Sequence, residues 1–246
     1  KTPGWPPHKE PVATLLEAAR RQALPVLGEW DLFEQALQGL KRSQAYAPKT
    51  LCITGTNGKT TTTAWTAHLL RQAGVSAQTA GNIGPSLLDA LMQALDANTL
   101  PQVWVVELSS FQLHDAAQPP DCDAAAITNL TPDHLDWHGD MASYASAKGH
   151  IFGEHGVLVI NRDDPEVEAL VPAPVVVKQG RGRPSKTVER DVIRFGLDAP
   201  RRPGDFGLLV ENGMAWLVRA REQEEELKGL KRRKDEDDEL VIQRLM

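Results

Sequence analysis

The stretch Ile53-Thr54-Gly55-Thr56-Asn57-Gly58-Lys59-Thr60-Thr61-Thr62 decides how the rest of the chain is interpreted. An apolar, β-favouring run at residues 50–53 leads into it, and a helix-compatible run at residues 61–73 follows. A strand, a glycine-containing loop and a helix are the context of a phosphate-binding loop, because glycine lets the backbone approach phosphate and the N–H groups at the helix start point at the anion. We therefore expect Lys59 to reach the β- and γ-phosphates of a nucleotide and the Thr60 hydroxyl to bind Mg²⁺.

The stretch departs from the common phosphate-loop pattern at one position. That pattern has a first glycine five residues before the second, and the residue five positions before Gly58 is Ile53. The alternative interpretation is a Gly-Asn turn that joins a strand to a helix without binding a ligand. The strand before the loop and the threonine run after it favour a shorter variant of the phosphate loop.

Composition limits the class of protein. The formal net charge of −6 argues against a broad nucleic-acid-binding surface. No apolar run is long enough to span a membrane, and no signal-peptide pattern is present. The only cysteines are Cys52 and Cys122, so zinc-type spacing and a disulfide framework are both excluded. We expect Cys52 to be a buried thiol and the compartment to be the reducing cytoplasm.

Strand and helix patterns alternate after residue 50, and this alternation predicts an α/β fold. The sheet is expected to be mostly parallel with helices on both faces, as in phosphate-loop proteins, so that ligands lie beyond the carboxyl ends of the strands. The Glu211-Asn212-Gly213 turn lies between two apolar runs and predicts a hairpin, and hence a small antiparallel sheet toward the C-terminus. The expected strands are residues 76–80, 103–108, 123–127 and 156–160, and the expected helices are residues 61–73, 86–95 and 141–152.

The first 47 residues carry too little apolar material for an independent domain. They predict helices at residues 11–20 and 30–40 with a short strand at residues 24–28 between them. Residues 48–246 then form the main domain. Because the chain starts at Lys1 and its last residues read as an interrupted strand, we expect a fragment of a longer protein.

Polar side chains follow the predicted strands. Asn82 and Glu107 stand at the ends of two of them, and a carboxylate after an apolar strand is costly inside a sheet unless it holds a cation or is paired. Both interpretations of Glu107 stay open at this point. Taken alone, His134 would be a surface histidine or a helix-start residue, and Lys148 would be a surface lysine. His138, His150 and His155 are also interpreted as surface residues.

Five motifs in a fixed order resemble the central ATPase domain of the Mur ligases. Two of them, at residues 81–84 and 107–113, are most similar to the D-glutamate-adding branch of that family. The resemblance covers about residues 50–165, and residues 1–47 resemble the tail of the family's UDP-binding domain and a linker. The motifs are Ile-Thr-Gly-Thr-Asn-Gly-Lys-Thr-Thr at 53–61, Gly-Asn-Ile-Gly at 81–84, Glu-Leu-Ser-Ser-Phe-Gln-Leu at 107–113, Asn-Leu-Thr-Pro-Asp-His-Leu-Asp at 129–136 and Tyr-Ala-Ser-Ala-Lys at 144–148.

The resemblance implies a chemistry, two cofactors and two substrates. ATP with Mg²⁺ phosphorylates the terminal carboxylate of UDP-N-acetylmuramoyl-L-alanine, and the amine of D-glutamate attacks the acyl phosphate to give an amide, ADP and phosphate. The family also has an adenine-reading segment and a C-terminal domain that do not follow Met246, so this chain alone is expected to be inactive. A cytoplasmic monomer is expected.

The resemblance also implies site residues. Lys59, His134 and Lys148 would be catalytic, with Lys148 carbamylated. Asn82 and Ser109 would contact the muramoyl substrate. The nucleotide would be held by Gly55, Thr56, Asn57, Gly58, Lys59, Thr60 and Thr61, and the metal ions by Thr60, Glu107, His134 and carbamylated Lys148.

Three alternatives stay open. One is another Mur or folylpolyglutamate-type ligase, which would carry other residues after the acidic residue of the 107–113 motif. Another is a nucleotide-binding module without catalysis. The third is a generic phosphate-loop NTPase or kinase, which would not need Asn82, His134 and Lys148 together.

Overall fold

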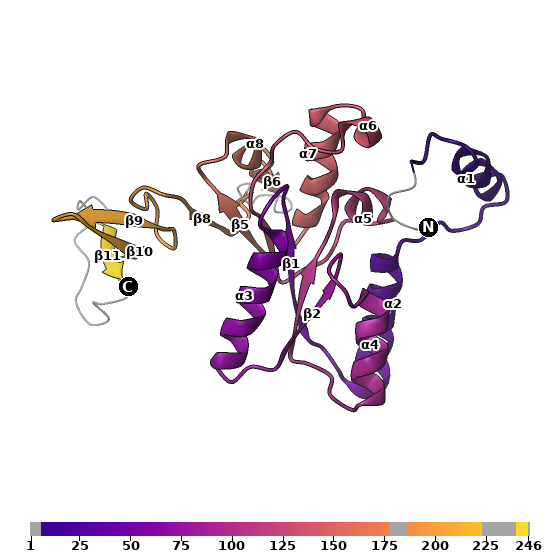
Figure 1. Ribbon diagram of the computed structural model, residues 1–246, viewed down its shortest axis with the longest axis horizontal. Coiled ribbons are helices and arrows are strands. Elements are labelled where there is room, and N and C mark those ends of the chain that lie inside the picture. The colour runs from indigo at the N-terminus through magenta and orange to yellow at the C-terminus, as the bar shows by residue number, and fades with distance from the viewer. Residues whose placement is uncertain (1–5, 178–185, 223–239, 246) are drawn as a thin grey trace, which may run out of the picture. The chain divides into compact units, whose positions relative to one another are not determined.

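The computed structural model describes residues 6–177, 186–222 and 240–245. The chain divides into two compact units, residues 1–156 and 157–246. Figure 1 shows the helices and strands of both units.

The first unit contains the predicted parallel sheet. Its strand order is β4-β1-β3-β2, and every neighbouring pair in this order is parallel. The strands therefore end at the same edge, where β1 leads into the loop at residues 55–58 and β3 ends at Glu107. The strands are β1 (Lys49–Thr54), β2 (Ala77–Gly81), β3 (Val103–Glu107) and β4 (Ala124–Ile127).

Alternation along β3 explains why helices cover both faces of the sheet. Val103 and Val105 pack in one buried cluster with Ala67 of α3 (Lys59–Gln72). Trp104 lies between them in sequence, so its side chain points to the opposite face, where its ring meets Phe33 edge-on at a centroid distance of 5.5 Å. Figure 1 accordingly shows α3 on one side of the strands and α2 beside α4 on the other.

The other helices of this unit begin where the sequence supplies caps or turns. Asp140 accepts a hydrogen bond from the backbone N–H of Ser143 and caps α7, whose predicted continuation to residue 152 is a 3-10 turn instead. The helices are α1 (Val12–Arg21), α2 (Glu29–Gln44), α4 (Leu87–Asp96), α5 (Ser110–Asp115), α6 (Leu135–His138) and α7 (Met141–Gly149), followed by η1 (His150–Phe152).

The strand predicted at residues 24–28 is wrong. This segment has no regular secondary structure. Pro25 has no N–H to give to a sheet, and the N–H of Gly28 is used to cap α2 by donating to Oδ2 of Asp31 at 2.6 Å. The helix that follows extends four residues beyond the predicted end, to Gln44.

The prediction of a free thiol at Cys52 is also wrong, and with it falls the argument from cysteine usage for a reducing compartment. Cys52 in β1 forms a disulfide with Cys122, which lies just before β4. Because β1 and β4 are parallel neighbours, the two Cα atoms are 6.2 Å apart, within the usual range for a disulfide. The two cysteines are 70 residues apart, so no local spacing signals the pairing.

The second unit contains the predicted antiparallel sheet. β5 and β8 are parallel, whereas β9, β10 and β11 are antiparallel neighbours. The predicted turn at residues 211–213 joins β9 to β10, and both Asn212 and Gly213 have positive φ values of 52° and 78°. The elements are β5 (Val157–Asn161), α8 (Pro165–Glu168), β6 (Val175–Val177), β7 (Lys186–Val188), β8 (Val192–Phe195), β9 (Phe206–Glu211), β10 (Met214–Glu222) and β11 (Leu240–Arg244).

Candidate functional site

The loop between β1 and α3 is shaped by two glycines. Gly55 has a φ of 143°, and a Cβ atom there would overlap the hydroxyl of Thr128. Gly58 has a φ of 82° and immediately precedes the first helical residue, Lys59. The N–H groups of the first turn of α3 have no acceptor within the helix, so the loop ends in donors that suit an anion.

The loop is held from the carboxyl end of β4. The N–H of Asn57 donates to Oδ1 of Asn129 at 2.9 Å, and Nδ2 of Asn129 donates back to the carbonyl of Asn57 at 3.0 Å. The same carbonyl accepts from the Thr128 hydroxyl at 2.7 Å, and the N–H of Thr56 donates to the carbonyl of Asn129 at 2.8 Å. These four bonds fix the loop before any ligand binds.

Three of the predicted site residues meet at the end of β3. Glu107 is 1% exposed, and its Oε2 accepts from the Thr60 hydroxyl at 2.8 Å. Its Oε1 accepts from Nδ2 of Asn82 at 2.8 Å. The parallel register places Ile53 of β1 and Gly81 of β2 on either side of Glu107, so the carboxylate sits between the phosphate loop and the residue after β2.

This arrangement fits a divalent cation bound together with phosphates. Both side-chain partners of Glu107 are neutral donors, and it makes no ion pair among the residues that the structure describes. No group of three or more His, Cys, Asp or Glu side chains that could hold a metal occurs in the described part of the chain. Mg²⁺ needs no such group, because proteins commonly bind it through one or two carboxylates while phosphate and water oxygens complete the octahedron.

Lysines occupy two positions at the loop. Nζ of Lys59 donates to the carbonyl of Thr56 at 2.9 Å. Lys148, from α7, is 2% exposed and is therefore not a surface residue; its Nζ donates to the carbonyl of Gly55 at 2.8 Å. Burial and then the positive charge of Lys59 lower the pKa of Lys148 to about 7, against the opposing charges of Asp133 and Glu107. A large neutral fraction of the amine is thus present near neutral pH, and the neutral amine is the form that can react with CO₂.

His134 lies at the entrance to α6 with a left-handed backbone, φ 52°. Its imidazole is half exposed, with Nε2 3.4 Å from a carboxylate oxygen of Asp133 and its ring centroid 4.8 Å from that of Phe111. Its predicted role as a metal ligand remains a prediction, because its described contacts are with these two residues rather than with Thr60 or Glu107.

Ser109 has a structural task that the sequence analysis missed, although Ser109 followed by Gln112 matches the capping-box pattern of a helix start. It caps α5: its hydroxyl accepts from the N–H of Gln112 at 3.2 Å, and its own N–H donates to Oε1 of Gln112 at 2.9 Å. The residue is 8% exposed. Its predicted contact with substrate therefore stays a prediction, whereas Asn82 is exposed beside Glu107.

Sequence reasoning missed an aromatic cluster beside the loop. The hydroxyl of Tyr144 lies 3.0 Å from that of Thr56, and Nζ of Lys148 lies 4.9 Å from the Tyr144 ring centroid. His138, expected at the surface, instead stacks on Phe111 with an interplanar angle of 6°. The sequence offered one signal: His138 follows His134 by four residues, and side chains at this spacing lie on the same side of a helix.

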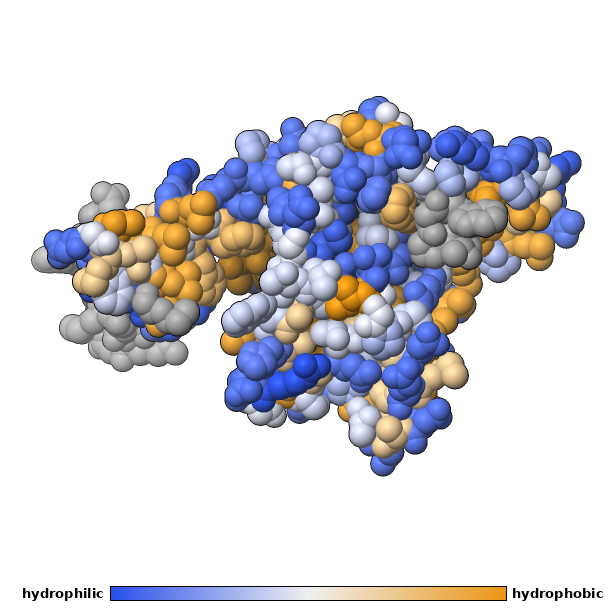
Figure 2. Space-filling model, in the orientation of Figure 1, coloured by the Kyte–Doolittle hydropathy of each residue, from blue (hydrophilic) through white to orange (hydrophobic). Residues whose placement is uncertain are grey.

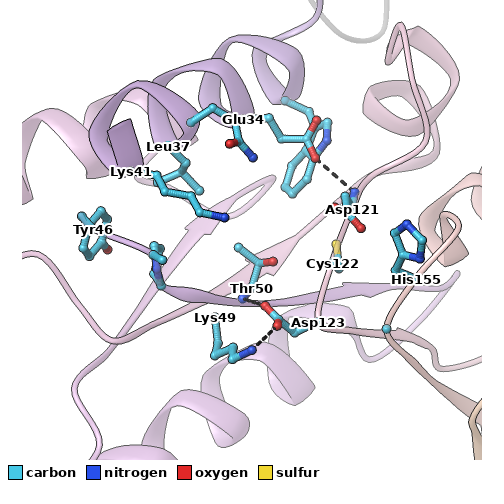
Figure 3. Close-up of a pocket in the computed structure, with 15 residues that line it drawn as sticks. Glu34, Leu37, Lys41, Tyr46, Lys49, Thr50, Asp121, Cys122, Asp123 and His155 are labelled. Atoms are coloured by element: carbon cyan, nitrogen blue, oxygen red, sulfur yellow. Dashed lines mark hydrogen bonds and ion pairs between the residues drawn. The ribbon is translucent and has the colours of Figure 1, made fainter. Parts of the chain in front are cut away.

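A cavity of about 420 Å³ lies at the other end of β1, away from the phosphate loop. Figure 3 shows Glu34 and Lys41 of α2 on one side of it, and Lys49 paired with Asp123 at 2.6 Å on the other. Figure 2 shows mostly hydrophilic and neutral colours around the loop between β1 and α3. Lys49 and Asp123 at this cavity pair with each other, whereas Glu107 at the carboxyl end of the sheet has only neutral side-chain partners among the described residues.

Comparison with known proteins decides the family. The model of the Mur ligase middle domain matches residues 53–196, which include the loop, Glu107, His134 and Lys148. The chain belongs to the Mur ligase family.

Two curated relatives in this family carry the same name, UDP-N-acetylmuramoylalanine–D-glutamate ligase. The protein from Albidiferax ferrireducens is 53% identical over 246 residues, covering 100% of this chain and 46% of the relative. The protein from Ralstonia nicotianae is 49% identical over 236 residues, covering 96% and 44%. The chain thus spans a little under half the length of the Mur ligases that it matches.

Among solved structures, the fold is similar to that of a UDP-N-acetylmuramoyl-L-alanyl-D-glutamate–2,6-diaminopimelate ligase. The TM-score is 0.57 at 22% identity, over 79% of this chain and 42% of the other. This similarity confirms the α/β fold predicted from the alternation of strands and helices. Within the described ranges, no helix combines the length and apolar character that a membrane crossing requires.

Proposed function

We propose that this chain is part of the ATP-dependent ligase that joins D-glutamate to UDP-N-acetylmuramoyl-L-alanine. The contact of Thr60 and Asn82 with the buried Glu107, at the end of a preformed phosphate loop, is the observation that carries the proposal. The identity of about half of all residues to ligases named for this reaction supports the choice of substrates.

The reaction has two bond-forming steps. The γ-phosphoryl group of ATP passes to the terminal carboxylate of the muramoyl substrate, which forms an acyl phosphate and releases ADP. The amine of D-glutamate then attacks the acyl carbon, phosphate leaves, and the amine loses a proton to solvent as the amide forms. Phosphoryl transfer depends mainly on positioning and charge neutralisation, which is what the residues around the loop offer.

Each residue of the site has a proposed task in these steps. The amides from Gly55 to Thr61 and the Lys59 ammonium bind the nucleotide phosphates. Thr60 and Glu107 would hold Mg²⁺, which would neutralise charge on the transferring group, and His134 with carbamylated Lys148 would hold a second ion. Asn82 and Ser109 orient the muramoyl substrate. The proposal places the enzyme, as a monomer, in the cytoplasm, where ATP is available.

Calorimetric titration of the chain with Mg²⁺-ATP tests the nucleotide site. The variant Lys59→Ala removes the ammonium that faces the phosphates and should lose binding while the chain stays folded. The matched control is Lys41→Ala, on α2 at the cavity away from the loop, and it should bind as the wild type does. Equal affinity of Lys59→Ala and wild type would reject the assignment of the loop as the phosphate site.

A further inference from the structure

The imidazole of His138 is the central ring of the cluster beside the phosphate loop. Its Nε2 lies 3.0 Å from the hydroxyl of Ser110, at the start of α5. Its ring stacks on Phe111 with centroids 5.7 Å apart and meets the Tyr144 ring at an angle of 67° and 5.3 Å. One side chain of α6 therefore contacts both α5 and α7.

On one side, the imidazole of His138 supports His134 through Phe111. The Phe111 ring contacts both imidazoles, with its centroid 4.8 Å from that of His134 and 5.7 Å from that of His138. The imidazole of His134 is half exposed, whereas the proposed metal-binding residues Glu107 and Lys148 are buried. A fixed Phe111 ring restricts the directions that the His134 imidazole can take.

On the other side, the ring supports the loop and Lys148 through Tyr144. The Tyr144 hydroxyl lies 3.0 Å from that of Thr56 within the loop, and the Lys148 ammonium lies 4.9 Å from the centre of the Tyr144 ring. A rotation of Tyr144 would therefore disturb both the loop and the amine of Lys148. His138 blocks that rotation edge-on.

The chemistry of the ring argues against a role in packing alone. Nδ1 of His138 is buried without a hydrogen-bond partner among the described residues, which costs stability that leucine or phenylalanine would not. Burial, first, and then the neighbouring His114 and Lys148 lower its pKa to about 4, so the ring is neutral at neutral pH. A neutral imidazole can bond to Ser110 and stack on Phe111 without adding charge beside Lys148.

We propose that His138 is a positioning residue of the ligase site, which holds His134 through Phe111, and Lys148 and the loop through Tyr144, in one fixed arrangement. This inference rests on the proposed function, because His134 and Lys148 take their roles from it. His138 itself touches neither nucleotide nor metal in this scheme. In this scheme His138, four positions after His134, stabilises the metal site without binding the metal.

Two measurements on the chain test the inference. NMR of the histidine rings, without metal or nucleotide, reports the surroundings of His134 directly. Electron paramagnetic resonance with Mn²⁺ and ATP reports metal affinity. The variant His138→Leu should shift the His134 ring signals and weaken Mn²⁺ binding about ten-fold, the loss typical of residues that orient metal ligands. The affinity for ATP without metal should fall less than the affinity for Mn²⁺, whereas a general loss of packing would lower both alike.

Three further variants complete the test. His138→Phe keeps an aromatic ring against Phe111 and Tyr144 but cannot bond to Ser110, so it should restore only part of the Mn²⁺ affinity. Ser110→Ala removes only the hydroxyl at Nε2 and should by itself shift the His134 ring signals, so the test does not depend on the folding of His138→Leu. His68→Leu replaces an exposed histidine of α3 outside the cluster and should change neither measurement.

The outcomes separate this inference from the proposed function. Unchanged His134 signals in His138→Leu and Ser110→Ala would overturn the positioning role. A wild-type chain that binds neither Mn²⁺ nor ATP would instead count against the proposed function, and the metal-free NMR comparison would still decide whether His138 positions His134.

Discussion

Thr60 donates its hydroxyl hydrogen to Oε2 of Glu107 at 2.8 Å, which ties the first turn of α3 to the end of β3. The two residues are 47 positions apart, and the parallel pairing of β1 with β3 brings them together. The contact places a buried carboxylate directly beside a helix start that favours anions. A negative side chain and bound phosphates can share this corner only with a cation between them.

Replacement of that carboxylate should uncouple nucleotide binding from magnesium. Glu107→Gln keeps the shape of the side chain but removes its charge. Mg²⁺ should then no longer strengthen ADP binding, a loss of about ten-fold or more relative to wild type. Calorimetric titration of ADP, with and without Mg²⁺, measures the effect.

The matched control is Asp96→Asn, an exposed acidic residue at the end of α4. Asp96→Asn also removes one negative charge, but Mg²⁺ should strengthen ADP binding in this variant as much as in the wild type. If Glu107→Gln also kept this effect of Mg²⁺, the buried carboxylate would be structural, which was the second interpretation that the sequence allowed.

The sequence predicted the parallel strands and the loop because their signals are local. The apolar run before Glu107 and the glycines around Asn57 identify a buried strand and a tight turn wherever they occur. The strand expected at residues 24–28 is absent. The hydrophobic residues that predicted it do not reveal that the N–H of Gly28 donates to Asp31 in a helix cap.

Tertiary contacts decided the remaining features of the site. Lys148 stands among small residues and looks like a surface lysine, yet α7 buries it against the carbonyl of Gly55, 93 positions earlier. His138 became part of the aromatic cluster only when α5, α6 and α7 came together. The motifs that resemble the Mur ligases identified Lys148 but not His138, since a family resemblance carries over only the roles that it already contains.

The glycine that opens the loop should be intolerant of a side chain. Gly55→Ala requires a φ of 143° from an alanine and places its Cβ against the Thr128 hydroxyl, so we expect a loss of about 3 kcal/mol in the free energy of unfolding. Chemical denaturation measures this loss. Gly39→Ala, inside α2 with no atom within 4 Å of the added Cβ, should instead stabilise the chain by about 0.5–1 kcal/mol. A Gly55→Ala chain as stable as wild type would show that the loop can adopt another path.

Reduction of the disulfide should destabilise the first unit. The Cys52–Cys122 bond closes a long loop, with a sequence separation of 70, and its loss should lower the free energy of unfolding by about 4 kcal/mol. Denaturation with and without a phosphine reductant measures the change, and the Cys122→Ser variant should show no response to reductant. Two thiols that react in the native, non-reduced chain would contradict the bond.

Stability should rise with pH above 7 because of Lys148. The pKa of this amine is lowered from 10.5 to about 7 in the folded chain, so between these values the unfolded chain binds one more proton than the folded chain. The free energy of unfolding then increases with pH across this window, with a slope that approaches about 1.4 kcal/mol per pH unit, and below pH 7 this contribution to the slope disappears. Lys148→Met should remove the slope, whereas Lys9→Met, at an exposed position, should keep it. Denaturation midpoints in CO₂-free buffer from pH 6 to 10 provide the test, and parallel curves for wild type and Lys148→Met would show that the amine is charged in the folded chain throughout.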